Sequence, residues 1–177
     1  PLYETQDDPE LTAACIQAIA NRASENEASH ALVHRALIAA RLKDGASVTD
    51  ALANLMNHWI YYDSLMTNHD FDRNSCYCTD FAIGYLGIIN ESLLYSNTGK
   101  IEILPALPET GFESGKITGL KARTLATVDE IKWNLSDGTA SVTITSDAEQ
   151  IITVSCGISD KEETISLKAG ETVTVTF

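Results

Sequence analysis

The chain reads Gly99-Lys-Ile-Glu-Ile-Leu-Pro-Ala-Leu-Pro108 at the point where its hydrophobic pattern changes. Before this stretch, apolar residues recur every three or four positions, which is the spacing of an amphipathic helix. After it, apolar residues alternate with hydroxyl-bearing ones, which is the spacing of a strand with one buried face. The sequence therefore predicts an α+β chain in which helices come first and a sheet structure follows.

The first part of the chain predicts four helices joined by short links, a pattern that favours antiparallel hairpins. Asp8-Pro9 is a helix start, because a side-chain acceptor precedes a proline in the first turn. Ser47 with Asp50 three residues later is a variant of the capping box, and Gly45 suits a left-handed residue that ends the preceding helix. The expected helices are residues 9–23, 29–42, 47–60 and 80–95.

The second part predicts strands that alternate apolar and hydroxyl side chains, as in Val142-Thr-Ile-Thr145 and Val173-Thr-Val-Thr-Phe177. Ser136-Asp137-Gly138 and residues 168–171 supply hairpin turns between these strands. We expect an antiparallel β-sandwich of about seven strands.

The composition limits the possible partners. The 25 acidic residues outnumber the 12 basic ones and give a formal charge of −13, which opposes binding to nucleic acid or to an anionic membrane. No stretch of 18 apolar residues and no signal-peptide pattern is present in the sequence. A start at Pro1 rather than Met predicts a fragment or a processed chain, and the sequence leaves open whether the protein is secreted or cytoplasmic.

Two patterns resemble metal sites only in part. Asp70-Phe-Asp-Arg-Asn74 alternates oxygen ligands as a calcium loop does, yet its sixth position is Ser75 instead of Gly and its twelfth is Phe81 instead of Glu. Cys76 and Cys78 lack a second Cys or His pair at zinc-ligand spacing. We therefore predict free thiols, no metal and no cofactor.

Five motifs together resemble the C-terminal end of family 95 glycoside hydrolases, a group of inverting exo-glycosidases typified by α-L-fucosidases. Members of that family cross from an (α/α)6 barrel to a β-sandwich through Leu-Leu-Pro-Ala-Leu-Pro, then Gly-Leu-Arg-Ala-Arg and a Val-Asp-Xaa-Xaa-Trp strand. The similar motifs here are Ile103-Leu-Pro-Ala-Leu-Pro108, Gly119-Leu-Lys-Ala-Arg123, Val128-Asp-Glu-Ile-Lys-Trp133, Val33-His-Arg35 and Ala40-Arg-Leu-Lys-Asp-Gly45.

The resemblance implies the domain organisation and the partners. Residues 1–98 would be the last helices of an (α/α)6 catalytic barrel, and residues 99–177 would be the C-terminal β-sandwich domain. The expected partners are a glycan substrate and the N-terminal remainder of the same enzyme. In the family, the general acid is a glutamate and two asparagines orient the attacking water. These residues belong to segments before Pro1, so this chain alone is expected to be inactive.

The resemblance also implies a general base. The family places it in a Phe-Gln-Ile-Asp-Gly-Asn-Phe-Gly motif, and Tyr77-Cys-Thr-Asp-Phe-Ala-Ile-Gly84 occupies that position, with Asp80 as the base. Phe81 and Ala82 replace the family's Gly and Asn, which puts the sugar specificity in question. A helix dipole also stabilises a carboxylate at a helix start, although an aspartate there is by default an N-cap.

His34 and Arg35 take the place of a histidine and a lysine in the family's sugar pocket, so we predict that they bind substrate. The alternative for His34 is a bond to a backbone carbonyl. Trp59 stacks on a sugar or, more commonly for this residue type, fills a core. His30 and His69 carry no comparable signal.

Two other functions remain open from sequence. The chain could be a non-catalytic carbohydrate-binding or structural module, with Trp133 and Tyr95 as stacking platforms. It could also be a degenerate homologue that kept the fold and lost its chemistry, a possibility raised by Phe81 and Ala82.

Overall fold

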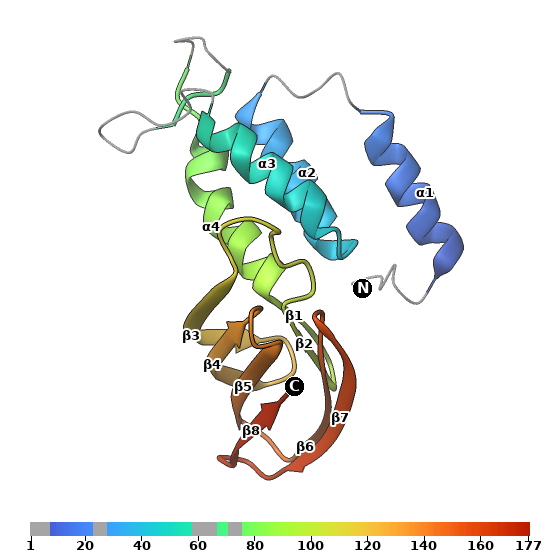
Figure 1. The fold of residues 1–177 in the computed structure, drawn as a ribbon, viewed down its shortest axis with the longest axis vertical. Coiled ribbons are helices and arrows are strands. Elements are labelled where there is room, and N and C mark those ends of the chain that lie inside the picture. Colours follow the sequence, from blue (N-terminus) through green and yellow to red (C-terminus); the bar gives the residue numbers. More distant parts are fainter. Residues whose placement is uncertain (1–7, 23–27, 58–66, 71–75) are drawn as a thin grey trace. The chain divides into compact units, whose positions relative to one another are not determined.

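The structure is a computed structural model that describes residues 8–22, 28–57, 67–70 and 76–177. It separates into two compact units, Pro1–Asn90 and Glu91–Phe177, and each is considered by itself (Figure 1). The predicted domain boundary after residue 98 concerns the complete enzyme and stays a prediction.

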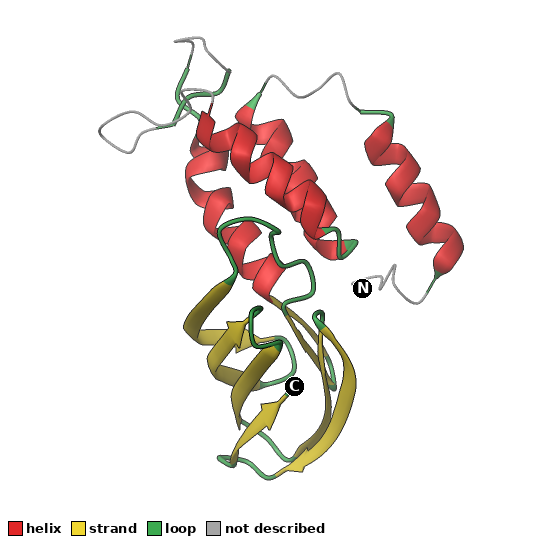
Figure 2. Ribbon diagram, in the orientation of Figure 1, coloured by secondary structure: helices red, strands yellow, loops and turns green. Residues whose placement is uncertain are grey.

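Helices precede strands along the chain, as the change of period predicts (Figure 2). The described elements are α1 (Pro9–Ala20), α2 (Ser29–Arg41), α3 (Gly45–Asn57), α4 (Thr79–Leu93), β1 (Leu94–Asn97), β2 (Lys100–Ile103), β3 (Ser114–Ala122), β4 (Ala126–Asn134), β5 (Thr139–Ser146), β6 (Gln150–Cys156), β7 (Ser159–Leu167) and β8 (Thr172–Thr176). The α+β class is confirmed, whereas a closed helical barrel is not part of the described structure.

Helices α2 and α3 form a hairpin with a buried seam. Ala36, Val48 and Leu55 are fully buried along it. The turn between the helices corrects two predictions. Lys43, with φ 60°, is the left-handed residue instead of Gly45, which begins α3. The cap is Asp44 instead of Ser47, because Asp44 Oδ1 accepts from the Ser47 N–H at 2.9 Å.

One prediction about the ends of the other two helices is confirmed and one is wrong. Asp8 caps α1 as predicted, since its carboxylate accepts from the N–H groups of Glu10 and Leu11. The prediction that α4 continues to Tyr95 is wrong. The helix ends at Leu93 because the next four residues pair with β2 in a hairpin around Gly99, whose φ of 71° suits a tight turn.

The strands form two four-stranded sheets, in the orders β1-β2-β6-β7 and β3-β4-β5-β8. Eight strands are present in the described residues instead of about seven, because the helix-to-sheet hairpin adds β1. The sheets are rich in antiparallel pairs, as the predicted antiparallel sandwich requires, but one pair departs from the prediction, since β2 pairs with β6 in parallel. That pairing arises because β3, β4 and β5, which lie between β2 and β6 in the sequence, belong to the other sheet.

The core of Glu91–Phe177 comes from alternating residues of both sheets. Ile101 and Ile152 from one sheet are fully buried, and so are Ile131, Val142 and Ile144 from the other. The hydroxyl side chains between them face outward, where Thr143 and Thr145 of β5 hydrogen-bond to threonines of β8. The period-two pattern of the sequence therefore corresponds to one buried face on each sheet.

The junction stretch is fixed at several points within this second unit. The Leu104 N–H donates to the Leu93 carbonyl at 2.8 Å, and the Ala106 N–H donates to the Ser92 carbonyl at 3.2 Å. Leu104 has a φ of 54° and is buried. The Gly157 N–H donates to the Ile103 carbonyl at 2.8 Å. The proline-framed motif thus anchors the end of α4 to the turn between β6 and β7.

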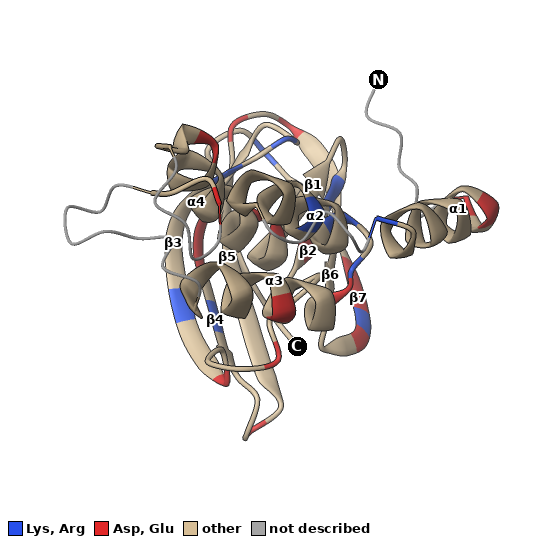
Figure 3. Cartoon of the chain, turned by 90° about the horizontal axis from the view of Figure 1, so that it is seen from above, with Lys and Arg blue, Asp and Glu red and all other residues tan. Residues whose placement is uncertain are grey.

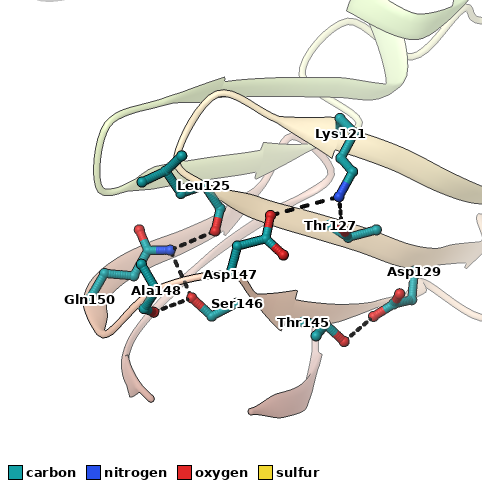
Figure 4. A network of polar contacts seen from close by, with 9 residues as sticks. All are labelled: Lys121, Leu125, Thr127, Asp129, Thr145, Ser146, Asp147, Ala148 and Gln150. Atoms are coloured by element: carbon teal, nitrogen blue, oxygen red, sulfur yellow. Dashed lines mark hydrogen bonds and ion pairs between the residues drawn. The ribbon is translucent and has the colours of Figure 1, made fainter. Parts of the chain in front are cut away.

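A polar network joins the β3–β4 turn to the β5–β6 turn (Figure 4). Gln150 Nε2 donates to the Leu125 carbonyl at 3.1 Å and to Ser146 Oγ at 2.7 Å, and the Asp147 N–H donates to the same carbonyl at 2.8 Å. Leu125 takes a φ of 52°, so these bonds hold a turn in an unfavourable conformation for leucine.

Charged residues are spread over several elements, as Figure 3 shows with acidic residues on α1 and α3 and basic residues on β3. Some lysines of the second unit lie beside carboxylates, for example Lys116 with Glu130 at 2.6 Å and Lys161 with Glu163 at 3.7 Å. No helix in the described part of the chain combines the length and apolar character needed to cross a membrane.

Candidate functional site

Asp80 lies in the first turn of α4, and its side chain is exposed. The residues on either side of this turn are anchored. Cys78 is 3% exposed and Phe81 is fully buried, with its ring edge-on to that of Tyr85 at 5.8 Å between centroids. A carboxylate at this position is stabilised by the positive end of the helix dipole. The helix therefore presents an accessible carboxyl side chain beside buried, packed neighbours.

Helices α2 and α4 run in the same direction side by side, as contacts at two levels show. A Cβ built on Gly84 would clash with Val33 Cγ1, and a Cβ on Gly87 would lie 3.8 Å from Leu37 Cδ2. From the first contact to the second, the chain advances toward the C-terminus on both helices. The first turns of α2 and α4 consequently lie at the same end of the helix pair, so Asp80 is at the end where α2 begins.

The two predicted substrate residues on α2 have different surroundings. His34 is exposed, and its ring meets that of His30 edge-on at 6.5 Å between centroids. Arg35 is partly buried, and its Nη1 donates to the Arg22 carbonyl at 3.1 Å. The roles of His34 and Arg35 in substrate binding stay predictions.

Structure adds a histidine cluster that the sequence did not indicate. The rings of His30 and His69 stack at 4.6 Å between centroids, with an interplanar angle of 28°. His69 Nδ1 lies 2.7 Å from Asp70 Oδ1. Ser29 ties the two segments together, because its N–H donates to the His69 carbonyl and its Oγ donates to the Asn68 carbonyl, both at 2.8 Å. Nothing in the local spacing of these residues pointed to their contact.

The segment of residues 67–70 is in turn bound to the residues that precede α4. The His69 N–H donates to the Cys76 carbonyl and the Cys78 N–H donates to the Thr67 carbonyl, both at 2.9 Å. The hydroxyl of Thr67 also donates to the Cys78 carbonyl. These bonds connect the start of α2 to the start of α4 through one small arch.

Several sequence predictions concern metals and thiols. Among the described residues, no group of three or more histidine, cysteine or acidic side chains is placed to hold a metal ion. Most of the calcium-like segment, together with Trp59, lies outside the described residues. All four cysteines are free thiols, as predicted. Burial raises the pKa of the Cys156 thiol above its ordinary value, so this thiol stays protonated at neutral pH.

The proposed stacking platforms of a carbohydrate-binding module are not available. Trp133 is 5% exposed and its Nε1 donates to the Phe112 carbonyl at 2.8 Å, while Tyr95 is 4% exposed. A buried ring cannot present its face to a sugar. The hypothesis that Trp133 and Tyr95 stack on a glycan is therefore wrong, because both side chains belong to the core of the second unit.

The close approach of α2 and α4 yields a testable prediction for Gly84. An alanine here is expected to destabilise the chain by about 2 kcal/mol, since the added methyl overlaps Val33 Cγ1. Val33→Ala removes that atom, so the double variant should be more stable than the sum of the single effects implies. Gly87→Ala is the matched control, because it meets only ordinary contact and should stabilise the helix by about 0.5 kcal/mol. Urea denaturation followed by circular dichroism at 222 nm measures all four variants, and equal costs for Gly84→Ala and Gly87→Ala would contradict the assigned packing.

A comparison with known protein families gives a match that lies within the second unit. Residues 95–177 match the family model described as the glycoside hydrolase family 95, C-terminal domain. The match supports the interpretation of the chain as a C-terminal portion of a family 95 enzyme. A search of curated proteins returned no match for the chain.

Proposed function

We propose that this chain is the C-terminal portion of an inverting exo-glycoside hydrolase that removes terminal α-L-fucose, with Asp80 as the general base of the complete enzyme. One observation carries the proposal. Helix α4 ends at Leu93 and β1 begins at Leu94, so Asp80 is joined without a linker to the domain that the family model matches from residue 95 onward. In the sequence, Asp80 precedes that domain at the position that the base occupies in the motif of the resemblance.

The chemistry requires two carboxyl groups. In an inverting enzyme the general base removes a proton from water as that water attacks the anomeric carbon, and a general acid protonates the leaving oxygen from the opposite face. The two groups are separated by about 6.5 to 9.5 Å to leave room for the water. Asp80 is exposed and can accept that proton. The acid belongs to a part of the enzyme outside this chain, so the chain alone is inactive.

The surface of α4 supports the presence of further protein beside Asp80. Ile83 is 75% exposed and Leu86 is 66% exposed, and both follow Asp80 on one side of the helix at three-residue steps. Exposed apolar residues this large are expected at a contact surface. We propose that the remaining barrel helices of the complete enzyme cover them and bring the acid toward Asp80.

Residues that depart from the family motif do not preclude catalysis. Phe81 is fully buried and packs on Tyr85, so in the described part of the chain its ring fills the core instead of the surface that carries Asp80. Ala82 lacks the amide of the asparagine that it replaces and can change the contacts of the sugar. His34 and Arg35 bind sugar hydroxyls from α2 in this proposal, because an imidazole can both donate and accept and a guanidinium can donate.

The test is hydrolysis of aryl α-L-fucoside by the full-length parent enzyme and by its Asp80→Asn variant. We expect the variant to lose about a hundredfold or more in kcat, the range for removal of a general base. Proton NMR of the first sugar released by the parent should show the β-anomer, as inversion requires. Aryl α-L-galactoside assayed in parallel tests the sugar specificity.

Asp50→Asn is the matched control, since Asp50 is an exposed aspartate on α3. It should retain the parent's kcat and its thermal midpoint. If Asp80→Asn and Asp50→Asn behave alike in an active parent, Asp80 is a structural residue at a helix start. If the parent hydrolyses neither substrate, the degenerate-homologue or binding-module hypothesis replaces this one.

A further inference from the structure

Three histidines meet at the start of α2, although they come from two separate segments. His30 stacks on His69, and His34 meets the edge of His30. The two segments are joined by two hydrogen bonds of the fully buried Ser29, one of which reaches a residue 39 positions away. The cluster of His30, His34, His69 and Asp70, called here the histidine cluster, is therefore a preorganised feature of the first unit.

The protonation pattern of His69 follows from its neighbour. Asp70 Oδ1 lies 2.7 Å from His69 Nδ1, and because a carboxylate can only accept, the tautomer with its proton on Nδ1 fits this contact. Nε2 of a neutral His69 is then an acceptor. The side chains of His69 and Asp70 are 34% and 29% exposed, which leaves the imidazole within reach of a ligand.

His30 presents a buried polar atom without a partner. Its Nδ1 is shielded from solvent and makes no hydrogen bond within the described residues. A buried polar atom without a protein partner is usually satisfied by water or by a ligand. Two neighbouring imidazoles with unused nitrogen atoms, next to the exposed imidazole of His34, offer several hydrogen bonds to one small polar molecule.

The charge and geometry of the cluster select the class of ligand. A metal is disfavoured because no group of three ligating side chains converges in the described residues. An anion is disfavoured by the Asp70 carboxylate and by the chain's net charge of −13. An imidazole ring with one donor and one acceptor nitrogen matches a hydroxyl group, which also donates and accepts at once. The cluster lies at the end of the α2–α4 pair that carries Asp80 in the first turn of α4.

We infer that the histidine cluster binds the hydroxyl groups of a neutral sugar, with His69 Nε2 accepting from one hydroxyl and Asp70 holding the required tautomer. The inference rests on the proposed function and deepens it, because it assigns sugar contacts to His30 and His69. His69 and Asp70 act here in binding, separately from the proton transfer proposed for Asp80.

The test is isothermal titration of L-fucose into the full-length parent enzyme, compared with two variants of His69. His69→Gln places an amide near the former Nε2 position, whereas His69→Asn places one near Nδ1. We expect His69→Asn to weaken the affinity for L-fucose at least tenfold and His69→Gln to stay within about threefold of the parent, as expected for loss of a hydrogen bond to a buried partner. Thermal midpoints of the two variants control for folding, and His30→Phe, which keeps the ring stack, should also weaken the affinity.

The outcomes separate this inference from the proposed function. Unchanged affinity in His69→Asn and His30→Phe, or no binding of L-fucose by the parent, overturns the inference even if Asp80→Asn abolishes hydrolysis. Equal weakening by the asparagine and glutamine variants also overturns the assigned role of Nε2. Binding that depends on His69 in a parent without hydrolytic activity supports the inference while the proposed catalytic function fails.

Discussion

Replacing Gly157 with alanine is expected to destabilise the second unit by about 3 kcal/mol, at the upper end of the cost of inserting a methyl into a packed site. A Cβ at this position would overlap the Leu104 carbonyl oxygen and lie 2.9 Å from the Leu104 carbonyl carbon and 3.1 Å from Pro105 Cα. These atoms belong to backbone, so they cannot move aside as a flexible side chain would. The Leu104 N–H is itself bonded to the Leu93 carbonyl, which restricts the backbone further.

Urea denaturation of the 177-residue chain measures this effect, with Trp133 as the fluorescent probe in a Trp59→Phe background. Gly138→Ala is the control, because Gly138 has a φ of 62° and a Cβ at this position would meet only open space. It should cost only about 1 kcal/mol, as expected for an alanine in the left-handed region. Similar urea midpoints for Gly157→Ala and Gly138→Ala would show that the backbone of Leu104 and Pro105 leaves room for a side chain at Gly157.

A comparable loss, about 3 kcal/mol, is expected for Gly115→Ala in β3. Gly115 lies directly opposite Trp133 of β4, and a Cβ there would overlap the indole at Cζ2 and lie 2.5 Å from Cη2 and 2.9 Å from Cε2. The indole is a rigid ring that is also fixed by its bond to the Phe112 carbonyl. An added methyl must therefore displace the ring and break that hydrogen bond.

A double-mutant cycle with Trp133→Phe tests the cause of this loss. The smaller ring leaves room for the methyl, so the double variant should be at least about 1 kcal/mol more stable than the sum of the single effects implies. Ser114→Ala, at the exposed neighbouring position, should change the stability by less than about 0.5 kcal/mol. Additive effects of Gly115→Ala and Trp133→Phe would rule out the ring contact as the source of the cost.

Both predictions concern motifs that carried the resemblance to family 95. They give a structural reason for particular residues in and beside those motifs. The junction stretch needs a neighbouring glycine because Leu104 approaches Gly157 backbone to backbone. The tryptophan of the β4 motif is a core residue that covers Gly115. In this chain, therefore, these motifs hold the fold together, and the proposed chemistry belongs to the helices that precede them.

Residues of the candidate site were only partly predictable. Asp80 could be proposed because it stands at a helix start within a recognisable motif, and the structure places it in the first turn of α4. His69 could not, because its partner His30 is far away in the sequence and no periodicity connects them. Asp44 was missed as a helix cap because it directly precedes Gly45, and that glycine was assigned to the end of the preceding helix instead of the start of α3.

The sequence by itself determined the order of helices and strands, the buried face of each strand and the motifs that resemble family 95. These features are local, because they depend on the spacing of apolar residues and on the backbone preferences of proline, glycine and capping side chains. Only the tertiary structure decided the parallel pairing of β2 with β6, the contact of Val33 with Gly84 and the meeting of His30 with His69. Such contacts join segments far apart in the chain, and their energies depend on packing and hydrogen bonds that no short stretch of sequence contains.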